Sequence, residues 1–420
     1  MSKQGAKCSF CHKPKDQALV LISGVDAYIC ESCVEQAQSI IEEEIMPFQK
    51  DTVSAAVNAL DSTEISMLKP VEIKRKLDEY VIGQDDSKKV LAVAVYNHYK
   101  RILQKNNQDD DEVEIEKSNV VMVGRTGTGK TLLARTIAKL LNVPFTIVDA
   151  TVFTEAGYVG EDVESMLTRL LQACDYDVAA AERGICYIDE IDKVARKNDN
   201  PSITRDVSGE GVQQALLKML EGTDILVPPQ GGRKHPEQKL VKVNTKNILF
   251  ICGGAFSGVE KQIAKRINTQ VIGFRGNDLD NIDMDNLLQY ISHQDLKSFG
   301  LIPELLGRLP VLTYLNPLDR NTLLRILTEP KNALTKQYER LFEMEDIKLT
   351  FAEEVLQLIV DKSLEYSLGA RGLRSICEAI MTDAMFELPS QSDVKAFEIS
   401  LDYATAKLNK TKLAVLKQAV

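Results

Sequence analysis

The residues from Gly124 to Thr131 have the composition and spacing of a loop that binds phosphate. They match the pattern Gly-x4-Gly-Lys-[Ser/Thr] and lie between an apolar strand pattern and a helix pattern. Glycines let backbone N–H groups curl around phosphate oxygens, and the start of the helix adds partial positive charge. We expect Lys130 to reach the β- and γ-phosphates and the Thr131 hydroxyl to ligate Mg²⁺. The predicted nucleotide-binding residues of this loop are Gly124, Arg125, Thr126, Gly127, Thr128, Gly129, Lys130 and Thr131.

Two neighbouring carboxylates, Asp189 and Glu190, follow a second apolar segment at residues 184–188. Hydrolysis beside a phosphate-binding loop needs one acid that holds Mg²⁺ and another that polarises the attacking water. We therefore assign Asp189 to Mg²⁺, together with Thr131, and Glu190 to the water. The alternative is a charged strand end without a chemical role, which the phosphate-binding loop makes less favourable. Asp192 is expected to cap the helix that follows.

Four of the eight cysteines, Cys8, Cys11, Cys30 and Cys33, form two Cys-x2-Cys pairs near the start of the chain. Each pair supplies two thiolates from one tight turn, which is the ligand spacing of a structural zinc site. A redox pair is the alternative. So short a segment has little hydrophobic core, and zinc binding contributes about 10–16 kcal/mol in peptide systems. The single cysteines are expected to be buried: Cys174, Cys186, Cys252 and Cys377.

The composition is that of a globular chain with an acidic surplus. The 420 residues are 44% hydrophobic and 27% charged, and the formal net charge is −10. This charge disfavours strong non-specific binding to nucleic acids or anionic membranes. No apolar run approaches the roughly 20 residues of a membrane-spanning helix, and no secretory or organelle signal is recognisable. We therefore expect a cytoplasmic location without a membrane partner.

The elements that must position these side chains follow from the hydrophobic pattern. Short apolar segments alternate with helix-period segments over residues 120–315, which predicts a parallel sheet covered by helices. Residues 68–99 have a helical pattern that is interrupted at Gly83. From Pro317 onward the pattern is mainly helical, with one strand-like segment at residues 347–350.

These patterns divide the chain into four parts. We expect a zinc-binding domain at residues 1–50 and a polar linker at residues 51–65. An α/β nucleotide-binding domain is expected at residues 66–316, followed by a smaller, mainly helical domain at residues 317–420.

Further motifs make the chain recognisable as a whole. They are Gly157-Tyr158-Val159-Gly160, Ile272-Gly273-Phe274, Gly307-Arg308-Leu309-Pro310 and Gly369-Ala370-Arg371-Gly372. In their order and spacing, together with the motifs above, they make the chain resemble the ClpX family of AAA+ unfoldases from Cys8 to about Leu413. The resemblance implies a large P-loop AAA+ core, a small C-terminal AAA+ domain and an N-terminal zinc domain of the treble-clef or ribbon type.

The resemblance implies loops that line a substrate pore. Tyr158 and Val159 match the loop that grips the polypeptide, although composition alone favours a turn with an anchored tyrosine. A Pro- and Gly-rich loop holds a basic triplet whose family role is to ring the pore entrance, and a solvated basic turn is its alternative. This triplet is Arg233, Lys234 and His235. Residues 204–209 resemble a further pore loop.

Other residues acquire nucleotide-related roles from the resemblance. Arg308 matches the arginine finger that reaches the nucleotide of the next subunit, a role that requires the family's hexamer; an unattached surface cation is the alternative. Arg371 matches the sensor-2 arginine of the small domain. Val81 and Ile82 match the segment that packs on adenine, where a plain helix break is the alternative.

One apolar tripeptide implies a protein partner. Ile272, Gly273 and Phe274 stand inside a polar stretch, and exposed apolar side chains favour association. In the family this loop docks on the ClpP peptidase, and the chain itself has no Gly-x-Ser-x-Gly or His-Glu-x-x-His motif.

One residue of the phosphate-binding loop departs from the family. Position 125 is arginine, where the family more often has proline.

The expected function is ATP-driven unfolding and translocation of tagged proteins by a homohexamer, which feeds ClpP and also remodels proteins alone. ATP, Mg²⁺ and Zn²⁺ are the implied cofactors, and the zinc domain is expected to recruit substrates and adaptors. A nucleic-acid remodeller and a chaperone without a peptidase are the rival functions. Residues 1–35 hold four lysines and four acidic residues, which disfavours binding to a phosphate backbone.

Overall fold

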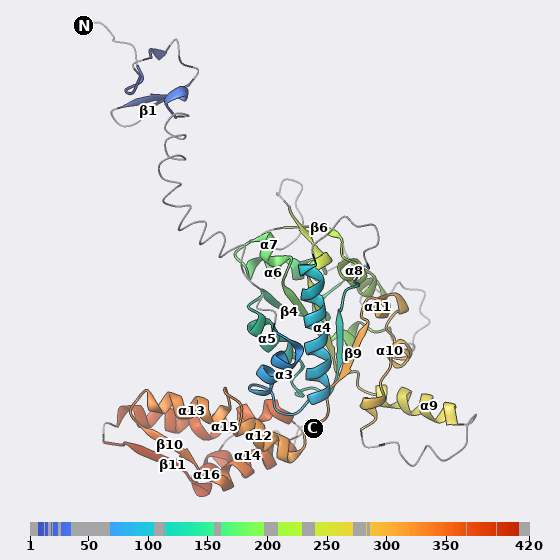
Figure 1. The fold of residues 1–420 in the computed structure, drawn as a ribbon. Coiled ribbons are helices and arrows are strands. Elements are labelled where there is room, and N and C mark those ends of the chain that lie inside the picture. Colours follow the sequence, from blue (N-terminus) through green and yellow to red (C-terminus); the bar gives the residue numbers. More distant parts are fainter. Residues whose placement is uncertain are drawn as a thin grey trace. The chain divides into compact units, whose positions relative to one another are not determined.

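The computed structural model groups the chain into two compact units, Met1–Ser66 and Met67–Val420 (Figure 1). The structure describes residues 7–11, 13–15, 18, 20–23, 27–34, 68–104, 113, 115–154, 161–196, 209–228, 240–271, 283, 286–366, 368–391 and 393–410.

The first unit is built around a small antiparallel hairpin. Strand β1 (Leu21–Ser23) pairs with β2 (Tyr28–Cys30), and residues 31–34 form a helical turn directly after it. A bridge between Lys7 and Pro14 closes the preceding turn. The two turns bring the two Cys-x2-Cys pairs together.

The second unit contains the expected parallel sheet, which forms its large lobe (residues 68–316). The strand order is β4-β5-β8-β3-β9, and every neighbouring pair is parallel. The central strands are buried along their length because helices cover both faces. The strands are β3 (Val120–Val123), β4 (Phe145–Asp149), β5 (Ile185–Asp189), β8 (Leu249–Gly254) and β9 (Val311–Tyr314).

The helices of the large lobe follow the predicted alternation. The predicted break at Gly83 is confirmed, since Gly83 and Gln84 have φ values of 66° and 60° and separate two helices. The helices are α3 (Pro70–Asp78), α4 (Asp85–Leu103), α5 (Lys130–Leu141), α6 (Ser165–Gln172), α7 (Val178–Ala181), α8 (Glu210–Glu221), α9 (Val259–Val271), α10 (His293–Phe299) and α11 (Pro303–Gly307). The 3₁₀ helices are η3 (Ala150–Val152), η4 (Ile191–Val194), η5 (Thr245–Asn247) and η7 (Leu287–Tyr290). A separate hairpin joins β6 (Asp224–Val227) to β7 (Val241–Asn244).

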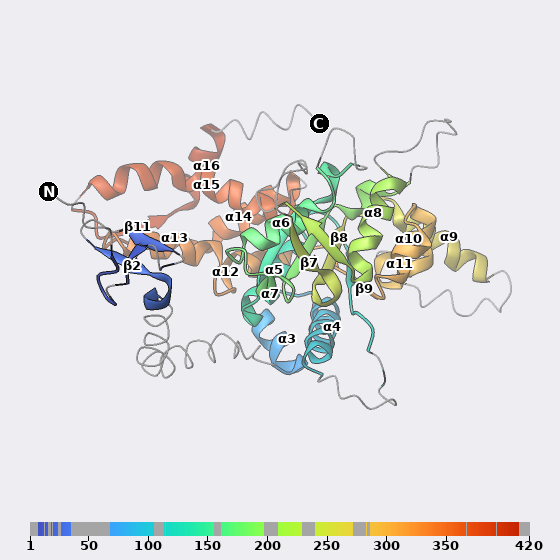
Figure 2. The ribbon, with the colours of Figure 1, turned by 90° about the horizontal axis from the view of Figure 1, so that it is seen from above.

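The small lobe (residues 317–410) is mainly helical, as expected (Figure 2), and has its own buried core. The predicted strand at residues 347–350 corresponds to β10 (Lys348–Phe351), which pairs in parallel with β11 (Ala396–Ile399). Its helices are α12 (Arg320–Thr328), α13 (Leu334–Glu343), α14 (Glu353–Glu365), α15 (Gly369–Glu387), α16 (Leu401–Lys410) and the 3₁₀ helix η8 (Leu388–Ser390). Among the described helices, none combines the length and the apolar character needed to cross a membrane.

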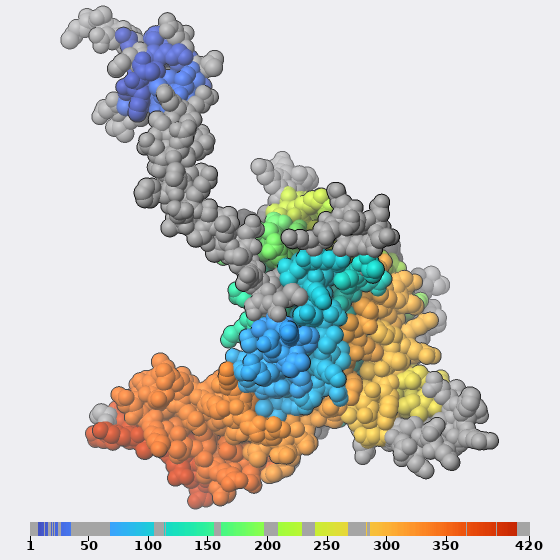
Figure 3. Space-filling view, viewed as in Figure 1, coloured from blue at the N-terminus to red at the C-terminus, as the bar shows by residue number. Residues whose placement is uncertain are grey.

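Two polar contacts join the lobes beside α3. Lys331 of the small lobe donates its backbone N–H to the carbonyl oxygen of Glu79, and its ammonium lies 2.6 Å from the Glu79 carboxylate. In Figure 3 the blue surface of α3 correspondingly meets the orange surface of the small lobe. The ion pair holds the pKa of Glu79 below its ordinary value, through the hydrogen bond with Lys331.

His98 on α4 predicts a dependence of stability on pH. It is fully buried, its Nε2 lies 3.0 Å from the carbonyl oxygen of Asn247, and its Nδ1 has no partner. Burial, followed by the nearby charge of Arg101, lowers the pKa of His98 to about 3. Below pH 6.5 the unfolded chain therefore binds a proton at His98 that the folded chain does not bind. The free energy of unfolding consequently decreases as the pH is lowered.

We expect the free energy of unfolding to fall by about 1.4 kcal/mol per pH unit below 6.5 from this group alone. Urea unfolding of the unmodified chain and of His98→Gln, followed at pH 7 and pH 5.5, measures the difference. The variant should lose less stability on acidification. Equal losses in both proteins would contradict the assignment.

Candidate functional site

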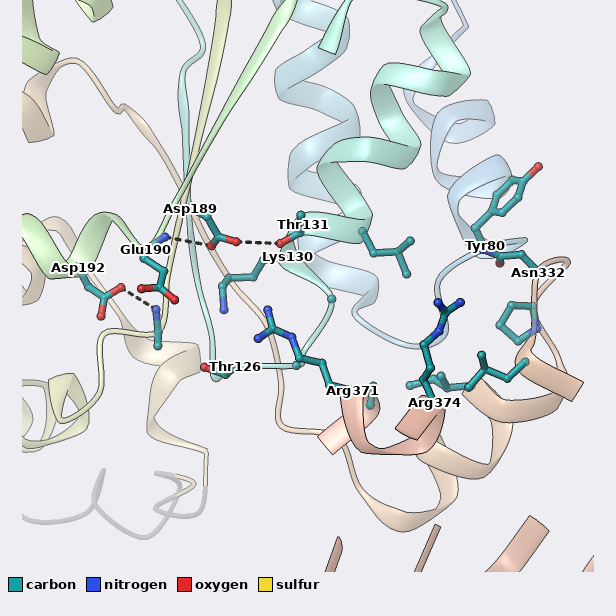
Figure 4. Close-up of a pocket in the computed structure, with 18 of the residues that line it drawn as sticks. Tyr80, Thr126, Lys130, Thr131, Asp189, Glu190, Asp192, Asn332, Arg371 and Arg374 are labelled. Carbon is teal, nitrogen blue, oxygen red and sulfur yellow. Dashed lines mark hydrogen bonds between the residues drawn. The ribbon is translucent and has the colours of Figure 1, made fainter. Parts of the chain in front are cut away.

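A cavity of about 600 Å³ lies at the carboxyl ends of β3 and β5, between the sheet and the small lobe (Figure 4). Crevices at this end of parallel strands are the usual ligand sites of such sheets. Both lobes contribute to its wall. The lining residues are Tyr80, Thr126, Gly127, Gly129, Lys130, Thr131, Leu132, Asp189, Glu190, Asp192, Lys193, Ala255, Ser257, Ile326, Pro330, Asn332, Leu334, Ala370, Arg371 and Arg374.

The phosphate-binding loop forms one wall of this cavity. Gly127 and Gly129 have φ values of 82° and 102°, which L side chains rarely adopt, so glycine suits both positions. Lys130 begins α5 and is largely buried, and its ammonium donates to the carbonyl oxygens of Gly124 and Arg125. Burial lowers the pKa of Lys130, while Asp189 opposes the shift. A phosphate anion in the cavity would give this buried cation a stronger partner than two neutral carbonyls.

The two predicted carboxylates stand opposite this loop, as Figure 4 shows. The Thr131 hydroxyl donates to Oδ2 of Asp189 over 3.1 Å, and the backbone N–H of Glu190 donates to Oδ1 over 3.0 Å. Hydroxyl and carboxylate oxygens are the ligands that Mg²⁺ prefers, so this pair fits the metal. Glu190 is exposed to the cavity and has a φ of 55°, a left-handed conformation that is uncommon outside glycine and clusters at functional sites.

The prediction that Asp192 caps the next helix is wrong. Asp192 lies inside η4, and its Oδ1 accepts the backbone N–H of Ala255 over 3.0 Å. Ala255 follows β8, so this contact ties the ends of two neighbouring strands together at the cavity.

Two arginines of α15 provide the cationic side of the cavity. Arg371, predicted from the sequence, points in Figure 4 toward Lys130 and the phosphate-binding loop. Arg374 lies about one helical turn further along and also lines the cavity, but sequence reasoning missed it. The signal was present, since side chains three positions apart share a helix face.

The opposite end of the cavity is apolar, and the contact of Val81 and Ile82 with adenine stays a prediction. Tyr80, Ile326 and Leu334 line it. Val81 and Ile82, predicted to contact adenine, are buried beside Tyr80 and do not line the cavity. In the phosphate-binding loop, Arg125 stands where the family more often has proline. Its side chain is exposed and does not line the cavity, so it leaves the cavity unobstructed.

Arg308 stands apart from the cavity of its own chain. It follows α11, and its guanidinium lies 3.4 Å from the Glu221 carboxylate with about half of the side chain exposed. The amide of Asn119 donates to its backbone carbonyl oxygen over 3.0 Å, which fixes the main chain. Arg308 thus lies on the surface, paired with Glu221 and outside the cavity.

The four predicted zinc ligands come together in the first unit. Their sulfur atoms all lie within 4.8 Å of one another, with 3.8 Å between Cys8 and Cys33 and 3.5 Å between Cys11 and Cys30. Four zinc–sulfur bonds of about 2.3 Å in a tetrahedron require sulfurs about 3.8 Å apart, so the residues fit the ion. Three of the other cysteines are buried as expected, and Cys174 is only partly buried.

Several predicted sites lie outside the described residues. They are Tyr158, Val159, Arg233, Lys234, His235, Ile272, Gly273 and Phe274, together with residues 204–208 of the further pore loop. Their described flanks are the β6–β7 hairpin, which brackets residues 229–239, and α9, which ends at Val271.

Three family models match this chain. Residues 6–43 match "ClpX C4-type zinc finger", residues 115–312 match "AAA domain (Cdc48 subfamily)", and residues 318–400 match "C-terminal, D2-small domain, of ClpB protein".

Similar proteins extend along nearly the whole chain. Proteins named "ATP-dependent Clp protease ATP-binding subunit ClpX" are 65% identical over 414 residues in Bacteroides fragilis, with 98% of each chain covered. The corresponding protein of Bacteroides thetaiotaomicron is 64% identical over 419 residues, covering 100% of this chain and 99% of the relative. That of Porphyromonas gingivalis is 61% identical over 403 residues, with 96% of each chain covered.

Proposed function

This chain belongs to the ClpX family of ATP-dependent Clp protease ATP-binding subunits, and on that premise we propose that it is an ATP-driven protein unfoldase and translocase. It is a Clp ATPase subunit with an AAA domain and a C4 zinc finger. Six copies form a ring, draw tagged polypeptides through the central pore, and pass them to the ClpP peptidase or release them remodelled. The ring works in a bacterial cytoplasm and has no nucleic-acid partner.

The gathering of cationic, hydroxyl and carboxylate side chains around one cavity supports the ATPase part of this proposal. Backbone N–H groups of residues 124–131 and the Lys130 ammonium bind the phosphates, and Thr131 and Asp189 would hold Mg²⁺. Bound Mg²⁺ would neutralise the negative charge on the phosphates while the bond between the γ-phosphate and ADP breaks. Glu190 orients the attacking water and accepts its proton.

The two-lobed wall of the cavity supports a coupling between nucleotide state and lobe orientation. Arg371 belongs to the small lobe and faces the phosphate-binding loop of the large lobe. The loss of a phosphate changes the charge that this arginine meets, and so changes the preferred angle between the lobes. In this proposal the large AAA+ domain spans residues 66–316 and the small one spans residues 317–420.

The remaining proposed roles belong to the predicted pore and docking residues, which lie outside the described part of the chain. Tyr158 and Val159 grip the polypeptide, while the basic triplet Arg233, Lys234 and His235 attracts substrate tails at the pore entrance. Ile272, Gly273 and Phe274 dock on ClpP. Folded domains are stable by only about 5–15 kcal/mol, so repeated pulling on a gripped tail suffices to unravel them.

Loss of fluorescence from a tagged fluorescent protein tests the unfoldase function. With ATP, the unmodified chain should extinguish the fluorescence, and Tyr158→Ala should slow this about tenfold or more while ATP hydrolysis continues. Phe274→Ala should unfold the substrate normally but fail to support its degradation by ClpP. The proposal would be contradicted if the chain hydrolysed ATP but unfolded no substrate, whichever of several tails the substrate carried and with adaptors present.

The zinc domain, residues 1–50, recruits substrates and adaptors in this proposal, and the linker at residues 51–65 tethers it. Removal of zinc by a chelator should unfold residues 7–34, because Cys8 and Cys30 are the only buried hydrophobic side chains among those described in this unit. Zinc content and limited proteolysis measure this: Cys11→Ser should lose zinc and be cut there, whereas Cys174→Ser should behave like the unmodified chain. Nucleotide binding should persist in both variants. A zinc-free chain that resists cleavage would contradict the prediction.

A further inference from the structure

Tyr187 lies in the middle of β5 and contacts the carboxylate that we assign to Mg²⁺. It stands two residues before Asp189, so the two side chains leave the strand on the same face. The Tyr187 side chain is fully buried, and its hydroxyl donates to Oδ1 of Asp189 over 3.2 Å. The other carboxylate oxygen, Oδ2, accepts the Thr131 hydroxyl. Each oxygen of Asp189 therefore has its own side-chain donor.

The neighbouring strand leaves space for this tyrosine at a single glycine. In the parallel pairing of β5 with β8, Ile188 lies opposite Cys252, which puts Gly253 beside the end of β5. A Cβ atom at Gly253 would stand 2.1 Å from the Tyr187 hydroxyl oxygen and 2.8 Å from the ring carbon that bears it. Both distances are far inside van der Waals contact. Any residue larger than glycine would consequently force the tyrosine away from its present position.

Two donors act on one oxygen of the Asp189 carboxylate. The Tyr187 hydroxyl and the backbone N–H of Glu190 both donate to Oδ1, and together they prevent the carboxylate from turning about its Cβ–Cγ bond. Its second oxygen is thereby kept facing Thr131 and the cavity. Without the hydroxyl, Oδ1 keeps only its backbone donor, and the carboxylate is held less firmly against rotation.

We propose that Tyr187, lodged against Gly253, is a positioning residue that presents Oδ2 of Asp189 to the magnesium ion. This inference rests on the proposed ATPase function and adds to it the group that holds the metal-binding acid in place. Partners of metal-ligating groups commonly contribute a factor of about 10 to 100 in metal affinity. The glycine at position 253 is then required by the tyrosine and not by a turn.

Binding of a fluorescent ADP analogue tests the proposal without measuring catalysis. In full-length Tyr187→Phe, the Mg²⁺ concentration that half-saturates the metal-dependent gain in affinity should rise about tenfold. Affinity for the analogue in EDTA should change less than about twofold, because Tyr187 does not line the cavity. Tyr99→Phe is a matched control, since this buried hydroxyl donates only to the Arg183 carbonyl oxygen, over 3.0 Å.

Gly253→Ala provides a second variant in which the hydroxyl is retained but displaced. It should reproduce the rise in the Mg²⁺ requirement, again with little change in EDTA. An unchanged Mg²⁺ requirement in either variant, or an equal loss of affinity with and without the metal, would overturn the positioning role. If the unmodified chain failed to bind the nucleotide at all, the proposed ATPase function would fall, and this inference with it.

Discussion

Replacing Glu190 with glutamine is expected to reduce ATP hydrolysis by about 10²–10⁴-fold while ATP binding persists. Glutamine has nearly the same shape, but its amide cannot accept a proton from the attacking water. The Lys130 ammonium, the Thr131 hydroxyl and the Asp189 carboxylate are unchanged in the variant, so the nucleotide keeps its contacts. Phosphate release and binding of a fluorescent ATP analogue, measured on the same preparation, separate the two effects.

The control for this substitution removes another exposed carboxylate, from a different part of the chain. Glu343 at the end of α13 pairs with Arg340 on the same helix and does not line the cavity. Glu343→Gln should hydrolyse ATP at the normal rate. A Glu190→Gln protein that retains hydrolysis within about tenfold of normal would remove Glu190 from the proposed mechanism, and one that no longer binds ATP would give it a different role.

The parts of the site that were predictable are those encoded by contiguous residues. The phosphate-binding loop carries its strand, glycines, lysine and helix in one segment, so its pattern defines its geometry. Asp189 and Glu190 were equally predictable from the sequence, because they end an apolar strand. The zinc site was predictable for a different reason, since the metal imposes both the ligand type and the paired spacing.

The errors and omissions concern residues whose partners are distant in sequence. Asp192 was predicted to cap the helix that follows it, but its partner Ala255 comes close only through the pairing of β5 with β8. The role of Gly253 beside Tyr187 depends on the same pairing. No local pattern contains the strand order β4-β5-β8-β3-β9 on which these contacts rest.

A turn beside the apolar end of the cavity buries the two residues that the resemblance assigns to adenine. Gly83 and Gln84 both have left-handed backbones, and the buried ammonium of Lys88 donates to the carbonyl oxygen of Val81. The turn thus directs Val81 and its neighbour Ile82 into the protein interior, while Tyr80 faces the cavity. Helical periodicity marks where such a segment breaks, but it carries no information on which flanking side chain faces the ligand.

Arg308→Ala is expected to reduce ATP hydrolysis by about 10³-fold or more, although the residue lies outside the cavity of its own chain. A guanidinium that reaches the nucleotide of the next subunit stabilises charge on the transferred phosphate, and alanine removes it. Arg320→Ala is the matched control, because Arg320 is a similarly exposed arginine paired with Asp361 on the small lobe. Phosphate release by the assembled oligomer, with size determined by light scattering, measures the effect.

Mixing two inactive variants distinguishes action on the next subunit from action within one chain. An Arg308→Ala subunit keeps an intact cavity, and a Glu190→Gln subunit keeps an intact Arg308. In a head-to-tail ring assembled at random from equal amounts, roughly one quarter of the sites combine both intact parts. Hydrolysis should therefore return to about a quarter of the normal rate per site, whereas an arginine that serves its own chain, or merely supports the fold through Glu221, would leave the mixture inactive.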